Sequence, residues 1–315
     1  DAILFLANRL SQDNLDVAVS LDSRAATNIA GDRGFAGFGS LEDLDDAGYV
    51  GARAFGKLLD FADDEGMLDD EGAVIRDGEI YTTLQDAVDA TAGSITIRMF
   101  AGTYTGSTEI DSTLIVKGYG KDRTILDGLA TDQILLIDGG SPCFYDMTLT
   151  AGAGYRGGAA EITGGTNIVF DGVDFIDNET TYSGGAVYSS SSAGPVVIRD
   201  ALIRGNASDV IGGAVAAYGD LTISDSTLTD NHSDLAAAVY SRGTVLIEDT
   251  AVTYNTGLDS DRGALTLRNY DITLSNVDFY ANTDTDLVLR WDTTTYDGLG
   301  DGVSVTCDSI ACVGL

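Results

Sequence analysis

Several residue types that build functional sites are scarce in this sequence. Its 315 residues include one histidine, three cysteines, two prolines and one tryptophan. No zinc-ligand spacing, phosphate-binding loop or nucleotide-binding fingerprint occurs in it, which excludes the sites that depend on those motifs. No apolar run approaches the length of a transmembrane helix. Because 44 % of the residues are hydrophobic, the chain still has enough apolar surface to bury a large core.

Basic residues are scarce as well. The 17 lysines and arginines stand against 50 acidic residues, and the formal net charge at pH 7 is −33. Such a surface repels nucleic acid and anionic membranes, and it needs salt or divalent cations to screen its own charge. We therefore expect an extracellular, secreted protein from a saline setting, with Asp1 as the first residue after a removed leader. No cofactor is implied, and calcium is the one ion that this acidity leaves open.

The main feature present is a short pattern that occurs five times in the second half of the chain. Each copy is a nine-residue run that ends in a large apolar residue and is followed three positions later by asparagine. The spacing of the asparagines is nearly constant, with a mean period of roughly 26 residues, which lies in the range of solenoid repeats. They are Asn178, Asn206, Asn231, Asn255 and Asn282.

The nine-residue runs predict pairs of strands. Positions two and four are apolar, as Ile168 and Phe170 are, which is the two-residue period of a β-strand. Position six holds a residue that tolerates a left-handed conformation and so marks a bend between two strands. The bend residues are Gly172, Asp200, Asp225, Asp249 and Asn276. Small residues, as in Gly184-Gly185-Ala186-Val187, open a further strand in each repeat.

This period, combined with the alternation inside each run, predicts a solenoid in which each repeat is one turn of coiled strand. The turns then stack into parallel sheets. The asparagines are expected to stack at one corner, each amide bonded to the turns above and below, because such a ladder satisfies the polar groups of a buried turn.

The paired GGA[AV] and [FILV]xxN elements resemble the repeats of right-handed parallel β-helix proteins. The likeness is greatest to the GGAI and FxxN repeats of chlamydial polymorphic membrane proteins and other bacterial surface β-helices, and it covers roughly Ile80 to Trp291. The fold class expected is therefore mainly β, a right-handed parallel β-helix. The resemblance implies export and cell-surface adhesion, while the wider β-helix class also contains pectate lyases and other glycan-acting enzymes.

The segment 1–62 predicts a small all-α domain. We expect helices over 2–7, 23–29 and 52–62, and a short helix opened by the capping box Ser40-Leu41-Glu42-Asp43. Gly48 and Gly51 bound a tight hairpin. This stretch resembles a tandem helix-hairpin-helix domain of the DNA-uptake receptors of competent bacteria. The matching residues are Ala25, Ala26, Ile29, Arg33, Phe38, Ser40, Leu41, Leu44, Gly48, Val50 and Gly51.

The helix-hairpin-helix resemblance implies that hairpin amides hold a DNA phosphate. The sequence departs from that pattern, because the first hairpin has no glycine and Asp22, Asp45 and Asp46 lie where phosphate would approach. Residues 1–71 carry 16 acids and 5 bases, so little counterion release is available to drive DNA binding. We expect this module to contact protein or to cover the open end of the solenoid.

The expected domains are the helical domain over 1–62, an acidic linker over 63–78 and the β-helix over 79–315. A cap helix over 79–92 and the following strand and GTY turn resemble the entry of pectate-lyase-like β-helices, where a helix covers the first coil. A carboxyl-terminal cap is expected over 292–315. Cys307 and Cys312 in it can close a disulfide loop, whereas Cys143 is expected to be a buried small residue.

No catalytic constellation emerges from the coil alignment. One column of equal positions contains Glu161, Tyr188, Ala216, Tyr240, Thr266 and Arg290, which brings only one carboxylate and one distant base together. Asp174 and Asp278 fall four coils apart, and His232 has no nucleophile at a recognisable spacing. The bend carboxylates are explained by their turn role, with a cation ladder as the alternative.

Three functions are compatible with these observations. The first is a non-enzymatic structural or adhesive surface protein that assembles head-to-tail into filaments through its helical domain and solenoid ends. The second is a protein that binds or cleaves an extracellular polysaccharide, with Tyr188, Tyr240, Arg268 and Arg290 as candidate contacts. The third is DNA capture by the helical domain, which the acidity of this domain disfavours.

Overall fold

In the computed structural model the chain has two compact units. The first comprises residues 1–104 and 116–124, and the second comprises 105–115 and 125–315. The structure describes residues 2–65, 67, 74–90, 96–257, 263–268, 271–283 and 285–289, together with the strand backbone of 294–297 and 305–307. The fold is mainly β, with 42 % strand and 18 % helix, and forms a β-solenoid of about seven turns with a small amino-terminal helical region.

The described part of the first unit contains six helices. They are α1 (Ala2–Arg9), α2 (Gln12–Asp16), α3 (Ser23–Asp32), α4 (Leu41–Asp45), α5 (Ala52–Asp64) and α6 (Leu84–Asp89). Ser11, Asp22, Ser40 and Thr83 cap α2, α3, α4 and α6 by accepting a backbone N–H of the first turn. The expected cap at Ser40 is therefore present, whereas the short helix α2 was not expected from the sequence.

The helices α2 and α3 repeat the arrangement of α4 and α5. Leu15 and Leu44 are fully buried, and so are Ile29 and Leu58, and the two pairs have the same separation in the sequence. The connecting hairpins share a left-handed residue at the same offset, Ser20 with φ 57° and Tyr49 with φ 65°. The helical region thus contains two helix pairs with matching burial and turn positions, preceded by α1.

The first unit also contains the first strands of the chain. They are β1 (Val74–Arg76), β2 (Glu79–Tyr81), β3 (Thr96–Met99), β4 (Gly102–Thr105) and β6 (Ile115–Lys117). Strand β1 pairs antiparallel with both β2 and β3, so the end of the stretch expected to be a linker is a β-hairpin. Helix α1 shares a core with this part, since the Phe5 ring lies 4.7 Å from that of Phe100.

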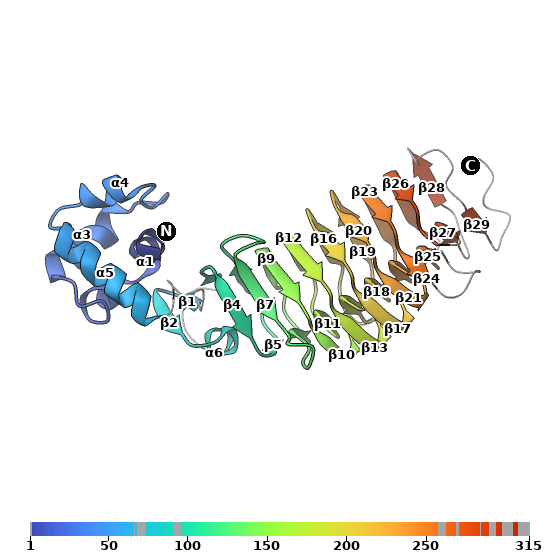
Figure 1. Cartoon of the computed structure of the whole chain (residues 1–315), viewed down its shortest axis with the longest axis horizontal. Coiled ribbons are helices and arrows are strands. Elements are labelled where there is room, and N and C mark those ends of the chain that lie inside the picture. Colours follow the sequence, from blue (N-terminus) through green and yellow to red (C-terminus); the bar gives the residue numbers. More distant parts are fainter. Residues whose placement is uncertain are drawn as a thin grey trace. The chain divides into compact units, whose positions relative to one another are not determined.

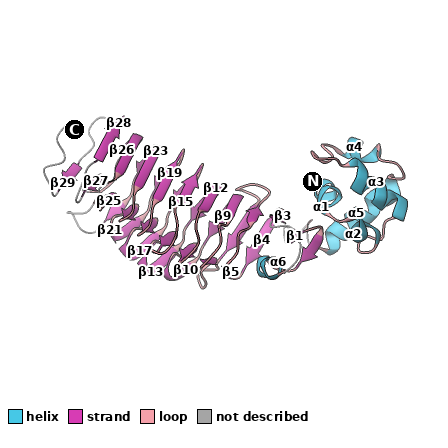
Figure 2. Cartoon of the chain, turned by 180° about the vertical axis from the view of Figure 1, so that it is seen from behind, coloured by secondary structure: helices cyan, strands magenta, loops and turns pink. Residues whose placement is uncertain are grey.

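The strands of the second unit stack as parallel neighbours in three sheets, which we call sheets one, two and three (Figures 1 and 2). In this unit, sheet one contains β7 (Thr124–Asp127), β9 (Cys143–Thr150), β12 (Ile168–Ile176), β15 (Val196–Arg199), β16 (Leu202–Arg204), β19 (Leu221–Ser224), β20 (Thr227–Thr229), β23 (Val245–Thr253), β26 (Ile272–Tyr280) and β28 (Thr294–Asp297). Sheet two contains β10 (Ala153–Arg156), β13 (Glu179–Ser183), β17 (Ala207–Ile211), β21 (His232–Leu235) and β24 (Thr256–Gly257). Sheet three contains β5 (Thr108–Ile110), β8 (Leu135–Ile137), β11 (Ala160–Ile162), β14 (Val187–Ser189), β18 (Val215–Ala217), β22 (Val239–Ser241), β25 (Leu265–Leu267), β27 (Leu287–Leu289) and β29 (Val305–Cys307).

Left-handed residues mark the corners of each coil. At position six of the nine-residue runs, φ lies between 48° and 66° from Gly172 to Asn276, as the sequence predicts. There are two further columns of left-handed residues. One lies just before the asparagines, as Asp177 does, and the other lies at the first of the small residues that precede each sheet-three strand, as Gly184 does. Aspartate, asparagine and glycine accept this conformation at low cost and fill most of these positions, although Ala236, Tyr254 and Ala281 adopt it as well.

The asparagine ladder is present. Asn206 donates from Nδ2 to Asn231 Oδ1 at 3.0 Å and to the carbonyl of Phe175 in the preceding coil, also at 3.0 Å. The same pattern joins each of the five asparagines to the next. At one end the backbone N–H of Gly152 donates to Asn178 Oδ1, and at the other Asn282 Nδ2 donates to Asp286 Oδ1 at 3.1 Å.

The core of the second unit lies between the three sheets. The apolar positions two and four of the runs are at most 2 % exposed, as Val245 and Ile272 are at 1 %. Phe144 stacks on Phe170 with ring centroids 5.1 Å apart. Burial at this density is the main stabilising contribution. Among the helices in the described residues, none has the length and apolarity needed to cross a membrane.

Candidate binding face

Five tyrosines and three arginines from sheets two and three, and from the segments that follow sheet-three strands, form a continuous chain of side-chain contacts. We call this set the tyrosine–arginine strip. Its members are Tyr155, Arg156, Tyr182, Tyr188, Tyr218, Tyr240, Arg242 and Arg268. In a chain with a net charge of −33, three arginines on one face are a local exception to the acidity.

The coil register places these residues together. The middle residue of each sheet-three strand points outward, which gives the column Glu161, Tyr188, Ala216, Tyr240, Thr266 and Val288. Two positions later the chain leaves the sheet, and there Tyr218, Arg242 and Arg268 follow β18, β22 and β25. Each of their backbone N–H groups donates to the last strand residue of the preceding coil. Stacking therefore converts positions one coil apart in the sequence into neighbours.

The first part of the strip is organised by Arg156. Its guanidinium carbon lies 5.3 Å from the ring centroid of Tyr155, 5.5 Å from that of Tyr182 and 4.9 Å from that of Tyr188. The rings of Tyr155 and Tyr182 stack at 5.0 Å with an interplanar angle of 8°. The Nε atom of Arg156 is buried and has no hydrogen-bond partner among the described residues. Arg156 thus retains an unused donor within an aromatic environment.

The second part of the strip surrounds Tyr240. Arg242 Nε donates to its hydroxyl at 2.8 Å and Arg268 Nη1 donates at 3.4 Å. This hydrogen bond raises the pKa of Arg242, so the charge of Arg242 is secure at any relevant pH. Burial, and after it the neighbouring Tyr240, raises the pKa of Tyr218, so its hydroxyl stays protonated and able to donate.

The members of the strip differ in exposure, with two buried tyrosines beneath more accessible side chains. Tyr188 and Tyr240 are 7 % and 2 % exposed and form the floor. Tyr155 is 59 % exposed, Arg242 is exposed, and the remaining members are half-buried. The strip thus offers ring surfaces and guanidinium groups to a ligand from a rigid support.

The structure brings together three of the four contacts named from the sequence. Tyr188, Tyr240 and Arg268 belong to the strip, although Tyr188 and Tyr240 are its buried floor. The placement of Arg290 in the same column was wrong, because Thr266 pairs with Val288; Arg290 itself lies outside the described residues. Sequence reasoning missed Arg156, Tyr155, Tyr182, Tyr218 and Arg242, which lie outside the column that was aligned.

The carboxylates named from the sequence occupy structural positions. Asp174 is buried and its Oδ1 accepts the backbone N–H of Leu202 at 2.8 Å, and the register puts Asp278 four coils away. At the bend, Asn276 Nδ2 donates to Asp249 Oδ1 at 2.6 Å. Among the described residues no three His, Cys, Asp or Glu side chains are grouped so as to hold a metal ion. His232 Nδ1 lies 3.1 Å from Thr256 Oγ1.

The cysteines divide between the described and undescribed parts of the chain. Cys143 is a free thiol and is half-buried rather than fully buried as expected, because it lies on the outer side of sheet one at the start of β9. Cys307 lies in β29, but its side chain and the whole of Cys312 lie outside the described residues. The Trp291 position lies outside them as well.

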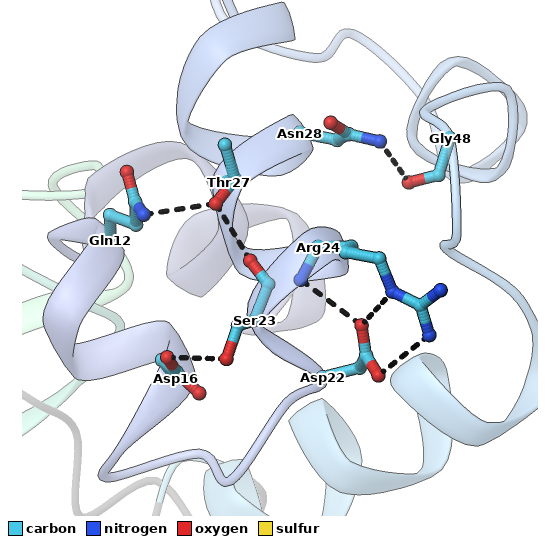
Figure 3. A network of polar contacts seen from close by, with 8 residues as sticks. All are labelled: Gln12, Asp16, Asp22, Ser23, Arg24, Thr27, Asn28 and Gly48. Atoms are coloured by element: carbon cyan, nitrogen blue, oxygen red, sulfur yellow. Dashed lines mark hydrogen bonds and ion pairs between the residues drawn. The ribbon is translucent and has the colours of Figure 1, made fainter.

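The two hairpins of the helical region differ at the start of the helix that follows. Asp22 caps α3, accepting the N–H of Arg24 at 3.0 Å and forming a double hydrogen bond with its guanidinium (Figure 3). This pairing lowers the pKa of Asp22. Gly51, at the equivalent position before α5, provides no side-chain cap. The carbonyl of Gly48 accepts from Asn28 Nδ2 at 2.6 Å, which ties the second hairpin to α3 (Figure 3).

Comparison with known proteins gives no further assignment. No protein-family model, no curated protein and no solved structure matches this chain.

Proposed function

We propose that this chain is a non-enzymatic extracellular binding protein whose tyrosine–arginine strip holds an acidic polysaccharide. The observation that carries the proposal is the unbroken series of ring and guanidinium contacts from Tyr155 to Arg268. Tyrosine rings supply rigid, amphipathic contact area. Arginine pairs with carboxylate or sulfate groups through two parallel hydrogen bonds. Together they match a sugar chain that bears regularly spaced acids.

The acidity of the rest of the protein favours binding of an acidic polysaccharide at the strip rather than elsewhere on the surface. A polyanion is repelled by an acidic surface and approaches only where positive charge accumulates. The strip supplies that charge, and its support by stacked strands fixes the spacing of the three arginines. A likeness to the surface β-helix repeats named above, as in polymorphic membrane proteins, agrees with an adhesive role.

The experiment is affinity electrophoresis of the full chain in gels that contain a polyuronate, a sulfated polysaccharide or a neutral glucan. We expect retardation by one of the acidic polymers and none by the neutral one. The variant Tyr155→Ala,Arg242→Gln should weaken binding roughly tenfold or more. Binding that survives this change, or an absence of binding to acidic polymers, would contradict the proposal.

Matched controls are available on other faces of the same solenoid. Tyr280 is 64 % exposed and contacts Tyr254, and Arg199 pairs with Asp171 at 3.0 Å. The variant Tyr280→Ala,Arg199→Gln removes the same residue types and the same charge without touching the strip. Its affinity should stay within about twofold of the unmodified chain.

A second proposal is that the helical region contacts another protein, including a second copy of this chain in a head-to-tail filament. Phe35 carries this proposal because it lies fully exposed in the segment between α3 and α4, and Val17 is 77 % exposed. Phe35→Ser should leave stability unchanged and reduce any assembly seen by sedimentation velocity and negative-stain microscopy. A monodisperse monomer in all salt conditions would contradict assembly.

The hairpin geometry gives less support to the third function, DNA capture. The Asp22 carboxylate occupies the N-terminus of α3 that a phosphate would need. The resemblance to tandem helix-hairpin-helix domains leaves the uncapped α5 end, next to Gly51, as the remaining hairpin amide site. Salt-sensitive retardation of duplex DNA by the full chain would support DNA binding. We expect no such retardation.

A further inference from the structure

A pocket in the first unit brings together three arginines that the strip does not use. Its volume is 240 Å³. The polar side chains that line it are Asn8, Arg9, Arg33, Asp77, Thr96 and Arg98. The whole chain contains only 17 basic residues. Three arginines around one pocket are therefore an unusual local accumulation of positive charge, which the solubility of an acidic protein does not explain.

The fold presents these arginines from three different elements. Arg9 is the last residue of α1, and Arg33 is the C-cap of α3. Arg98 lies in β3 opposite Ile75 of β1, and Ile75 lines the same pocket. The turn between β1 and β2 is attached to α2, because the carbonyl of Gly78 accepts from the backbone N–H of Ser11 at 3.3 Å. The walls of the pocket are therefore joined to one another.

Arg33 is held in place by backbone carbonyls. Its Nη1 donates to the carbonyl of Ala7 at 3.2 Å and to that of Leu10 at 2.6 Å. These carbonyls belong to the end of α1, where the helix dipole favours a cation. These contacts use only one of the three guanidinium nitrogens, so Nε and Nη2 have no hydrogen-bond partner among the described residues.

The pocket carries more positive than negative charge among the described residues, with three arginines and one carboxylate in its lining. Arg9, Arg33 and Arg98 form no ion pair with any described residue. The one carboxylate in the lining, Asp77, lies 3.6 Å from Arg76 Nε. Burial, followed by the charges of Arg98 and Arg33, lowers the pKa of Arg9, as expected for a guanidinium that has like charges close to it.

We propose that this pocket binds a small oxyanion of the phosphate or sulfate class. A tetrahedral dianion accepts hydrogen bonds from several guanidinium forks at once, and its charge offsets the repulsion among them. Asn8 does not compete for it, since its amide bonds the backbone of Phe38 in both directions. The site differs from the two hairpins, because the ends of α1 and α3 and the strand β3 form it.

The test is isothermal titration calorimetry and thermal unfolding of the full chain with inorganic sulfate, inorganic phosphate and glycerol phosphate, each compared with sodium chloride at equal ionic strength. We expect sulfate or phosphate to raise the unfolding midpoint by about 3 °C or more beyond chloride. If glycerol phosphate also binds, the pocket accepts a phosphate ester. If glycerol phosphate does not bind, the ligand is the free inorganic ion. Equal effects of chloride and all three anions would overturn the proposal.

Arg98→Gln separates an anion site from a structural role. If the arginines repel one another in the empty pocket, this variant should unfold at a higher temperature than the unmodified chain without anion, while its anion affinity falls at least about tenfold. Arg98→Lys should keep part of the affinity. Arg24→Gln is the control, since Arg24 is exposed and paired with Asp22. Unchanged anion affinity in Arg98→Gln would overturn the proposal.

The outcome is independent of the polysaccharide proposal. The pocket lies in the first unit and the strip in the second, so the two sites share no residue. Loss of sulfate binding in Arg98→Gln with unchanged gel retardation would separate them.

Discussion

The side-chain amide of Asn206 and the side-chain oxygen of Asn231 lie 3.0 Å apart in consecutive coils, and this oxygen also accepts the backbone N–H of Asn206 at 3.0 Å. Each inner asparagine therefore satisfies a backbone donor, a backbone carbonyl and its two ladder neighbours. Asn178, Asn206, Asn231 and Asn255 are fully buried, so none of these groups has water as an alternative partner.

Replacement of Asn206 by alanine should destabilise the solenoid strongly. The change leaves the N–H of Asn178 and the carbonyl of Phe175 buried without partners, and we expect a loss on the order of 3 kcal/mol in the free energy of unfolding. Urea unfolding monitored by circular dichroism measures it. Asn282→Ala is the control, because Asn282 is only part-buried and should cost about half as much. Equal losses of unfolding free energy in the two variants would show that burial does not determine how much each asparagine stabilises the protein.

Position six of the runs should tolerate glycine but not a β-branched residue. Asp225 has φ 49° and is exposed, so its side chain contributes little packing. Asp225→Val should destabilise by about 1–2 kcal/mol relative to Asp225→Gly, because the left-handed conformation crowds a branched Cβ. Both variants remove the same charge, so the difference in urea midpoint isolates the backbone. A difference near zero would mean that the corner relaxes.

The ladder should not extend backwards to Gly152. A Cβ atom at this position would lie 2.1 Å from the carbonyl oxygen of Gly158. Gly152→Asn should therefore destabilise by about 2 kcal/mol or more rather than add a rung. Gly56→Ala in α5 is an opposite control, since nothing lies within 4 Å of its Cβ and the gain in helix propensity is about 1 kcal/mol. Stabilisation by Gly152→Asn would contradict this account.

The net charge predicts that salt stabilises the chain. With a charge of −33, self-repulsion decreases as the Debye length falls from about 10 Å at 0.1 M to about 3 Å at 1 M salt. The midpoint of thermal unfolding should rise by several degrees over this range in both NaCl and KCl. Calcium chloride at the same ionic strength should act like the two monovalent salts if screening is the cause. A much larger shift with calcium alone would indicate a specific cation site instead.

The coil geometry could be predicted because it repeats. Each coil has an apolar pair, a bend residue and an asparagine at the same offsets. The positions equivalent to Asp200 and Asn206 therefore identify two corners in each of the repeated coils. Helix α2 was missed because it spans only a short polar-rich segment, Gln12–Asp16, too short for a helical period to show.

Only Tyr188, Tyr240 and Arg268 of the strip could be predicted, because the strip as a whole does not repeat. Its members come from different positions in successive coils, and Arg156 reaches the ring of Tyr188 from a strand of another sheet. The error at Arg290 has a different cause. Thr266 pairs with Val288, so the coil that starts at Leu265 is shorter than the earlier ones. The alignment placed Arg290 in the column and so overshot by two residues.

The carboxylate of Asp286 gives the ladder a direction and an end. In the links between asparagines, every Nδ2 donates to the Oδ1 of the later coil, and such aligned donors polarise one another. The final amide of Asn282 meets a charged acceptor in place of another asparagine. A further asparagine link after Asn282 would have to displace this acceptor, whereas a coil duplicated between two asparagines would only add one more identical link. The ladder can therefore lengthen through its interior, while its last amide is already held by a carboxylate.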